Sequence, residues 1–154
     1  MFVSENEMSL KFEKYVRENF GNAYMKEVSG LFGRPDFLFY SKKNEKNLII
    51  SFELKLHNWK RALIQAFRYK SFSNTAYVVL PEMTMEKAES NLELFKNYNI
   101  GLATFTEDNN FLIKYIPTST TPYSDNLTQK LNTVIKKKRG KAKNMDILIL
   151  EENP

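Results

Sequence analysis

The segment 48–56 constrains the fold of this chain more than any other stretch of its sequence. It reads Leu-Ile-Ile-Ser-Phe-Glu-Leu-Lys-Leu, with an apolar residue at every second position. Side chains of a β-strand point alternately to the two faces of a sheet, so the pattern predicts a strand with one face in a core. Ser51, Glu53 and Lys55 would share the other, polar face. Glu53 and Lys55 would lie about 7 Å apart along this strand and point the same way.

The rest of the chain alternates between helical and extended patterns. Ser4 and Glu7 form a capping box before apolar residues at helical spacing, which predicts a first helix that ends near Gly21. Further helices are predicted over 59–72, 84–98 and 124–139, and strands over 23–28, 36–40, 75–80, 101–106 and 110–116. Residues 42–47 would form a hairpin loop, and 145–150 a docked strand or a frayed end. This order predicts an α/β fold with a central mixed sheet flanked by helices, followed by a C-terminal hairpin and an appended helix.

The composition changes at residues 117–122, which read Pro-Thr-Ser-Thr-Thr-Pro. Such a run is typical of a linker. We therefore expect one domain over 1–116 and an extension over 117–154 that contains the linker and a basic helix and tail. The basic run 136–143 in this extension is typical of a solvated helix end, where cations suit the helix dipole. Contact with nucleic acid is the alternative.

The composition also excludes several kinds of site. The 154 residues include no cysteine and one histidine, His57, so disulfides, zinc–thiolate sites, cysteine nucleophiles and multi-histidine metal sites are excluded. No apolar run approaches the roughly 20 residues that a membrane span needs, and the first residues do not resemble a signal peptide. We expect a soluble, cytoplasmic protein with no membrane partner. Its net charge of +5 is compatible with a polyanion as partner.

Three charged residues on two predicted strands point to a chemical site. Asp36 follows Pro35 at the start of one strand, and Glu53 and Lys55 project from the polar face of the next. If the two strands pair, the carboxylates converge and repel each other, and a divalent cation would relieve that repulsion. Mg²⁺ favours one or two carboxylates together with water and phosphate oxygens. The ion would activate a bound water, which the lysine would position for attack on a phosphodiester.

The same residues resemble the signature of a known family. Arg-Pro-Asp at 34–36, followed by Phe-Glu-Leu-Lys at 52–55, is similar to the motif of the PD-(D/E)XK nuclease superfamily, whose members have the restriction-endonuclease-like fold. The segment 65–69, Gln-Ala-Phe-Arg-Tyr, resembles the Q-x-x-x-Y motif of some branches, and Glu13 resembles the first-helix glutamate of others. The resemblance covers roughly residues 4–116 and implies the family's αβββαβ core.

For the metal and the water, the resemblance implies five residues. Asp36 and Glu53 would ligate Mg²⁺ or Mn²⁺ together with the backbone carbonyl of Leu54. Lys55 would orient the attacking water, and Glu13 would reach the metal through a water molecule.

For the substrate, the resemblance implies residues on and near the predicted helix 59–72. Gln65 and Tyr69 would brace the site or touch the cleaved strand. The expected phosphate contacts, which supply affinity without sequence preference, are Arg34, Lys60, Arg61, Arg68 and Lys70.

Each of these residues also has a simpler explanation. Asp36 suits a turn after proline, and Glu53 and Lys55 suit a solvated strand face. Glu13 suits an exposed helix face, and Gln65 and Tyr69 suit a helix surface and the edge of the core.

The function that we expect from the sequence is metal-dependent hydrolysis of phosphodiester bonds, with DNA as the substrate. One alternative is a nuclease-like module that binds nucleic acid or a partner subunit without cleavage. The other is an RNA-cleaving toxin or defence effector. A homodimer, with residues 117–154 at its interface, would let two sites act on two strands.

Overall fold

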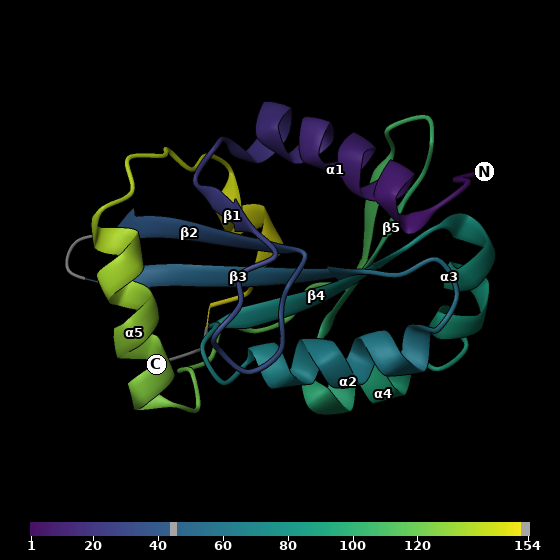
Figure 1. Cartoon of the computed structure of the whole chain (residues 1–154). Helices are drawn as coiled ribbons and strands as arrows, with labels where there is room; N and C mark the ends of the chain where they lie inside the picture. Colours follow the sequence, from purple (N-terminus) through teal and green to yellow (C-terminus); the bar gives the residue numbers. More distant parts are fainter. Residues whose placement is uncertain (44–45, 152–154) are drawn as a thin grey trace.

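The chain folds into an α/β structure, seen in a computed structural model that describes residues 1–43 and 46–151. Over these residues, five α-helices pack against one six-stranded mixed sheet (Figure 1). The elements are α1 (Glu5–Phe20), β1 (Tyr24–Lys26), β2 (Phe37–Lys43), β3 (Lys46–Leu54), α2 (Trp59–Tyr69), β4 (Thr75–Leu80), α3 (Glu82–Glu89), α4 (Leu92–Tyr98), β5 (Gly101–Phe105), β6 (Phe111–Tyr115), α5 (Asp125–Lys136) and a 3-10 helix (Met145–Leu148).

The strands lie in the sheet in the order in which they occur in the chain, β1 to β6. β1, β2 and β3 pair antiparallel, β3, β4 and β5 pair parallel, and β5 and β6 pair antiparallel. The parallel pairs require crossovers, which α2 and the pair α3–α4 provide. The expected α/β class and central mixed sheet are thus confirmed. Within residues 1–43 and 46–151, no helix is both long and apolar enough to cross a bilayer.

Helices cover both faces of the sheet. α1 lies on one face, and α2, α3 and α4 lie on the other (Figure 1). The α1 face has a phenylalanine-rich core that includes Phe12, Phe37 and Phe52. On the α2 face the core also takes in the polar side of β3, so Ser51 and Glu53 are buried there. The simpler explanation of Glu53 as part of a solvated strand face is therefore wrong, because α2 packs over this residue.

One predicted helix is divided in two. The sequence predicts one helix over 84–98, but α3 ends at Glu89 and α4 begins at Leu92. The Ser90 hydroxyl donates to the Glu86 carbonyl, and the Asn91 side-chain amide donates to the Lys87 carbonyl. Such side-chain bonds compete with the backbone ladder of a helix.

Two other boundaries also differ from the prediction. The hairpin after β2 is shorter than the predicted loop 42–47, because β2 continues to Lys43 and β3 begins at Lys46; residues 44–45 lie outside the described part. The segment 145–150 forms a 3-10 helix rather than a strand, and Leu150 then makes a single bridge to Thr118.

The segment after residue 116 packs onto the same sheet as the rest of the chain. Leu131 and Ile135 of α5 join the core of the α2 face. Met145 and Leu148 join the core of the α1 face, where the Leu148 carbonyl accepts a 2.6 Å hydrogen bond from the Tyr77 hydroxyl of β4. The predicted extension therefore contributes buried side chains to both cores.

Candidate active site

Asp36 and Glu53 come together where β2 begins and β3 ends. Phe37 pairs with Phe52 in the β2–β3 ladder, and the Asp36 N–H continues the ladder with a 3.0 Å bond to the Phe52 carbonyl. The regular register ends at Phe37, but the Asp36 side chain reaches the Leu54 N–H and its negative charge acts on Glu53, so the two carboxylates lie near each other. The two strands therefore do pair as the convergence of these carboxylates requires.

Both carboxylates are held by hydrogen bonds from the protein. The Leu54 N–H donates to Asp36 Oδ2 at 2.7 Å, and the Tyr69 hydroxyl donates to Glu53 Oε1 at 2.5 Å. Glu53 is 5% exposed and Asp36 is half-buried. The second oxygens, Asp36 Oδ1 and Glu53 Oε2, accept no hydrogen bond from residues 1–43 or 46–151. One oxygen of each carboxylate is thus left for another ligand.

Burial makes it costly to ionise this pair. Loss of water raises the pKa of Asp36 to about 6 and the pKa of Glu53 to about 8, and the negative charge of Asp36 adds to the effect on Glu53. The Lys55 ammonium lowers both pKa values, but not enough to restore ordinary ones. Near neutral pH the pair therefore favours binding of a proton or a cation.

Lys55 extends the strand that carries Glu53. Its N–H donates to the Val79 carbonyl of β4 at 3.2 Å, so β3 remains extended through this residue. By alternation its half-buried side chain lies on the face of Glu53. The N–H of Leu54 points to Asp36, and the carbonyl of a strand residue points to the same side as its N–H. The structure thus brings the Leu54 carbonyl to the same edge as Asp36, Glu53 and Lys55.

Tyr69 connects the site to helix α2 and to the loop before β2. Its hydroxyl oxygen lies 2.5 Å from Glu53 Oε1 and 3.1 Å from the Arg34 carbonyl, and the side chain is 1% exposed. Gly33 has φ +82°, and a Cβ there would lie 2.8 Å from Tyr69 Cε1. A glycine is therefore required for the loop to pass this closely over the ring. Tyr69 braces Glu53 from within the core and is not a surface contact for substrate.

Gln65 lies one helical turn before Tyr69 on the same face of α2. Its Oε1 atom is buried and has no hydrogen-bond partner within the described residues. A buried oxygen without a partner costs free energy, and a water molecule is the usual partner in such places. Gln65 therefore has an acceptor available on the face of α2 that braces the site.

Two glutamates of α1 differ in their relation to the site. Glu13 accepts hydrogen bonds from the Tyr24 hydroxyl at 2.7 Å and from the Lys26 ammonium at 2.8 Å. Burial alone would raise the pKa of Glu13, but these bonds outweigh it and hold the pKa below its ordinary value. Glu13 is thus engaged by β1, and the structure does not bring it to the paired carboxylates.

Glu5 is the α1 residue that acts on the pair, and the sequence reasoning misses it. Its Oε1 accepts a 3.4 Å hydrogen bond from the Leu56 N–H, just beyond β3. Its negative charge contributes to the raised pKa values of Asp36 and Glu53. The only sequence signal at Glu5 is that of an acidic first helical turn, which has a local explanation in the helix dipole.

Four of the predicted phosphate contacts are exposed: Arg34, Lys60, Arg61 and Arg68. Arg34 lies 3.8 Å from Glu27, and the Arg68 guanidinium lies over the Phe32 ring at 5.4 Å. Both contacts are on the surface and leave these cations accessible to an anion.

Lys70 does not meet the expectation of an exposed phosphate contact. It is 2% exposed, and its Nζ lies over the Tyr123 ring at 5.5 Å. The long aliphatic stem of a lysine packs readily against apolar surface, and here it does so under the segment that leads into α5.

A cavity of about 500 Å³ opens beyond the carboxyl ends of β3, β4 and β5. Leu56 and His57 line it, but Asp36, Glu53 and Lys55 do not. Glu53 and Lys55 are therefore close in sequence to residues that line this cavity, but the paired carboxylates do not line it themselves.

The donor set at the pair fits a hard divalent cation. Two carboxylates and one carbonyl are all oxygen ligands, and Mg²⁺ commonly completes such a set with water. Residues 1–43 and 46–151 contain no group of three or more His, Cys, Asp or Glu side chains arranged around one point. A cation here would thus depend on Asp36, Glu53, the Leu54 carbonyl and water.

Comparisons of the chain with protein-family models, curated proteins and solved structures gave no match.

Proposed function

We propose that the protein is a metal-dependent nuclease that hydrolyses phosphodiester bonds in nucleic acid, with DNA as the expected substrate. The observation that carries this proposal is the convergence of the Asp36 and Glu53 carboxylates where β2 begins and β3 ends, with Asp36 bonded to the Leu54 N–H and its charge acting on Glu53. A buried and a half-buried carboxylate that converge, each with an oxygen left over, would form a binding site for Mg²⁺ or Mn²⁺.

The chemistry of the proposal assigns a separate task to each residue. A bound divalent cation would lower the pKa of a water molecule and offset negative charge on the phosphate. Asp36, Glu53 and the Leu54 carbonyl hold the cation. Lys55, on the same face of the strand as Glu53, donates a hydrogen bond that orients the attacking water. Tyr69 keeps Glu53 Oε1 in place, which would leave the other oxygen of this carboxylate to bind the cation.

The order of the first elements supports the resemblance to the PD-(D/E)XK family. From α1 to β4 the chain has the order αβββαβ, with the Asp36 position before β2 and the Glu53–Lys55 positions at the end of β3. We infer a restriction-endonuclease-like core over this part of the chain. The exposed cations Arg34 and Arg68 flank the site and would contact phosphates of the substrate.

The test is a cleavage assay with purified wild type, Asp36→Asn and Lys55→Ala. Substrates are supercoiled plasmid, linear duplex, single-stranded DNA, a branched junction and RNA, each with Mg²⁺, Mn²⁺ or EDTA. We expect metal-dependent cleavage by wild type and its loss in both variants. Lys87→Ala, at an exposed position of α3, is the control and should cleave as wild type does. Cleavage that survives Asp36→Asn would exclude this mechanism, and cleavage of RNA alone would favour an RNA-cleaving effector.

A non-catalytic binding module is the second candidate. It is favoured by the bonds from Leu54 and Tyr69, which satisfy one oxygen of each carboxylate without any cation. In that case nucleic acid would bind in a salt-sensitive manner without turnover, and Asp36→Asn would leave binding unchanged.

A further inference from the structure

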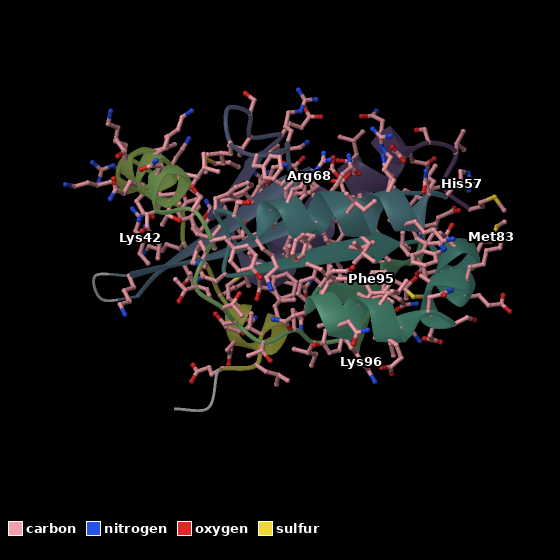
Figure 2. The ribbon with its side chains drawn as sticks, turned by 90° about the horizontal axis from the view of Figure 1, so that it is seen from below. Lys42, His57, Arg68, Met83, Phe95 and Lys96 are labelled. Carbon is pink, nitrogen blue, oxygen red and sulfur yellow. The ribbon has the colours of Figure 1, made fainter. Side chains whose placement is uncertain are left out.

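Six exposed basic residues gather where α5 ends. We refer to them together as the basic patch: Lys42, Lys136, Lys137, Lys138, Arg139 and Lys141. Lys42 comes from β2, and its Nζ donates a 2.7 Å hydrogen bond to the Lys138 carbonyl. In Figure 2, Lys42 lies beside α5, around which nitrogen-tipped side chains project into solvent. The fold therefore joins the basic run after residue 135 with a lysine from a distant part of the sequence.

Helix α5 is fixed in place on the sheet. Its Leu131 and Ile135 side chains are buried in the core of the α2 face. Asn132 Oδ1 accepts a 2.9 Å hydrogen bond from the side-chain amide of Asn47 on β3, and Lys130 Nζ donates to the Gly30 carbonyl at 2.7 Å. The basic patch thus has a defined position relative to β2 and β3.

The positive charge of the basic patch exceeds what the helix end requires. The carboxyl end of a helix carries about half a negative charge, whereas six cations collect here. None of the six makes an ion pair within the described residues, where the ion pairs involve other cations. No ion pair within residues 1–43 and 46–151 therefore offsets the repulsion among these cations, and a polyanion would relieve it.

The basic patch and the paired carboxylates lie at opposite ends of β2. Lys42 lies six positions after Asp36, and alternation from Leu38 and Tyr40 places it on the α2 face of the sheet, the face on which Glu53 is buried. Six residues of a strand span about 20 Å. A nucleic-acid strand covers this distance in roughly six nucleotides, at about 3.4 Å each. Two further exposed cations lie on the loop between β1 and β2: Arg34 is part of it, next to Asp36, and Lys130 of α5 donates to its Gly30 carbonyl.

We propose that the basic patch binds the phosphate backbone of a nucleic acid about six nucleotides from the bond that lies at Asp36 and Glu53. The choice of nucleic acid as the polyanion rests on the proposed function. Binding at the patch requires neither a divalent metal nor cleavage. It anchors the substrate electrostatically and adds no sequence preference.

The test measures binding of a 30-base-pair duplex DNA in EDTA by fluorescence anisotropy, over KCl concentrations from 50 to 200 mM. The patch variant carries Lys136→Gln, Lys137→Gln and Lys138→Gln. The control variant removes the same charge elsewhere, with Lys14→Gln, Lys87→Gln and Lys96→Gln. Circular dichroism and thermal melting establish that all three proteins are folded.

We expect the patch variant to bind at least tenfold more weakly than the control at low salt. The slope of log affinity against log salt should become shallower by about 0.9 for each phosphate that the patch variant no longer neutralises. Equal reductions of affinity in the two variants would overturn the proposal, because only total charge would then matter. The same proteins are also tested for binding to phosphatidylserine vesicles in EDTA. A patch variant that kept its DNA binding but lost its vesicle binding would also overturn the proposal. If the patch variant binds DNA more weakly than the control but wild type cleaves no substrate, the result would support binding at the basic patch and refute the proposed nuclease activity.

Discussion

Tyr69 donates a hydrogen bond of 2.5 Å to Glu53, and the same oxygen lies 3.1 Å from the Arg34 carbonyl. A phenol has one proton and cannot donate it fully to both acceptors. When Glu53 is ionised, the proton serves the carboxylate. When Glu53 is protonated, the carboxyl donates to Tyr69 and the tyrosine donates to Arg34. The position of this proton thus follows the ionisation of Glu53.

Tyr69→Phe removes a donor that favours the ionised form of Glu53. We expect the pKa of Glu53 to rise further and metal-dependent cleavage at pH 7 to fall roughly tenfold or more, as for loss of a bond to a charged group. The pH–rate profile should move to higher pH. Tyr77→Phe is the matched control, since it removes a buried 2.6 Å bond to Leu148 on the other face. It should lower stability without moving the pH profile, and an equal shift in both variants would contradict the assignment.

Glu53→Gln should change how stability depends on pH in the absence of metal. The pKa values of Asp36 and Glu53 are raised in the folded state, so their contribution to stability is complete below the unfolded values near 4. It is lost as pH rises through about 6 and about 8. In EDTA we therefore expect the melting temperature of wild type to fall between pH 4 and pH 9.

Glu53→Gln cannot ionise at this position, so it avoids the loss of stability that wild type shows near pH 8. At that pH the variant should melt several degrees above wild type, since each kcal/mol of stability corresponds to roughly 2–4 °C in melting temperature. Glu86→Gln, an exposed position of α3, is the control and should follow wild type. Mg²⁺ or Mn²⁺ should raise the melting temperature of wild type more at pH 8 than at pH 5, since protons compete with the cation. Differential scanning calorimetry measures both effects, and a flat wild-type curve would be inconsistent with a buried carboxylate pair.

Gly33→Ala and Gly30→Ala separate backbone strain from damage to the site. Both glycines have positive φ, so either alanine costs about 1–2 kcal/mol. At Gly33 the new Cβ would also lie 2.8 Å from the Tyr69 ring, whereas at Gly30 it would meet only the flexible end of Lys130 at 3.2 Å. We expect similar decreases of stability in chemical denaturation but a loss of cleavage only in Gly33→Ala. Equal activity of the two variants would show that Tyr69 tolerates displacement.

Glu5→Gln and Glu13→Gln test which glutamate of α1 serves the site. Glu5 acts on both carboxylates, so its neutral variant should lower their pKa values and move the pH–rate profile to lower pH. Glu13 is engaged by Tyr24 and Lys26, and its variant should lower stability and leave the profile in place. The reverse result would restore Glu13 as the glutamate closest to the chemistry.

Leu148→Ala tests the contribution of the segment after residue 116 to the fold. Leu148 is fully buried, and truncation of a buried leucine costs about 2–5 kcal/mol. Its neighbour Ile147 is 53% exposed, so Ile147→Ala should stay within about 0.5 kcal/mol of wild type. Urea unfolding monitored by tryptophan fluorescence gives both values. Equal small effects would indicate that this segment packs only loosely.

The sequence predicts the parts of the site that depend on local pattern. The alternation over 48–56 predicts β3 and puts Glu53 and Lys55 on one face, and Pro35 with Asp36 marks the start of β2. Because the two strands are joined by a short hairpin, their antiparallel pairing needs no long-range information. The meeting of Asp36 and Glu53 follows from these two facts.

What the sequence does not predict depends on how separate elements pack. Glu5 reaches the end of β3 only because α1 crosses the sheet at that point. Glu53 is buried because α2 covers this face of β3, although the polar residues at alternate positions of the strand suggest a solvated face. Lys70 has the charge of a surface residue, yet its stem is covered by the segment near Tyr123. Periodicity within one element carries no information about such packing.

The bond between Tyr77 and Leu148 has a consequence for synthesis of the chain. The ribosome adds Leu148 95 residues after Glu53, which takes roughly 5–20 s at common elongation rates. During that interval the nascent chain already holds both carboxylates, but the face of the sheet that receives Leu148 is open. Chaperones that bind exposed apolar strands would find their target in this period, and a stalled or truncated product would keep it.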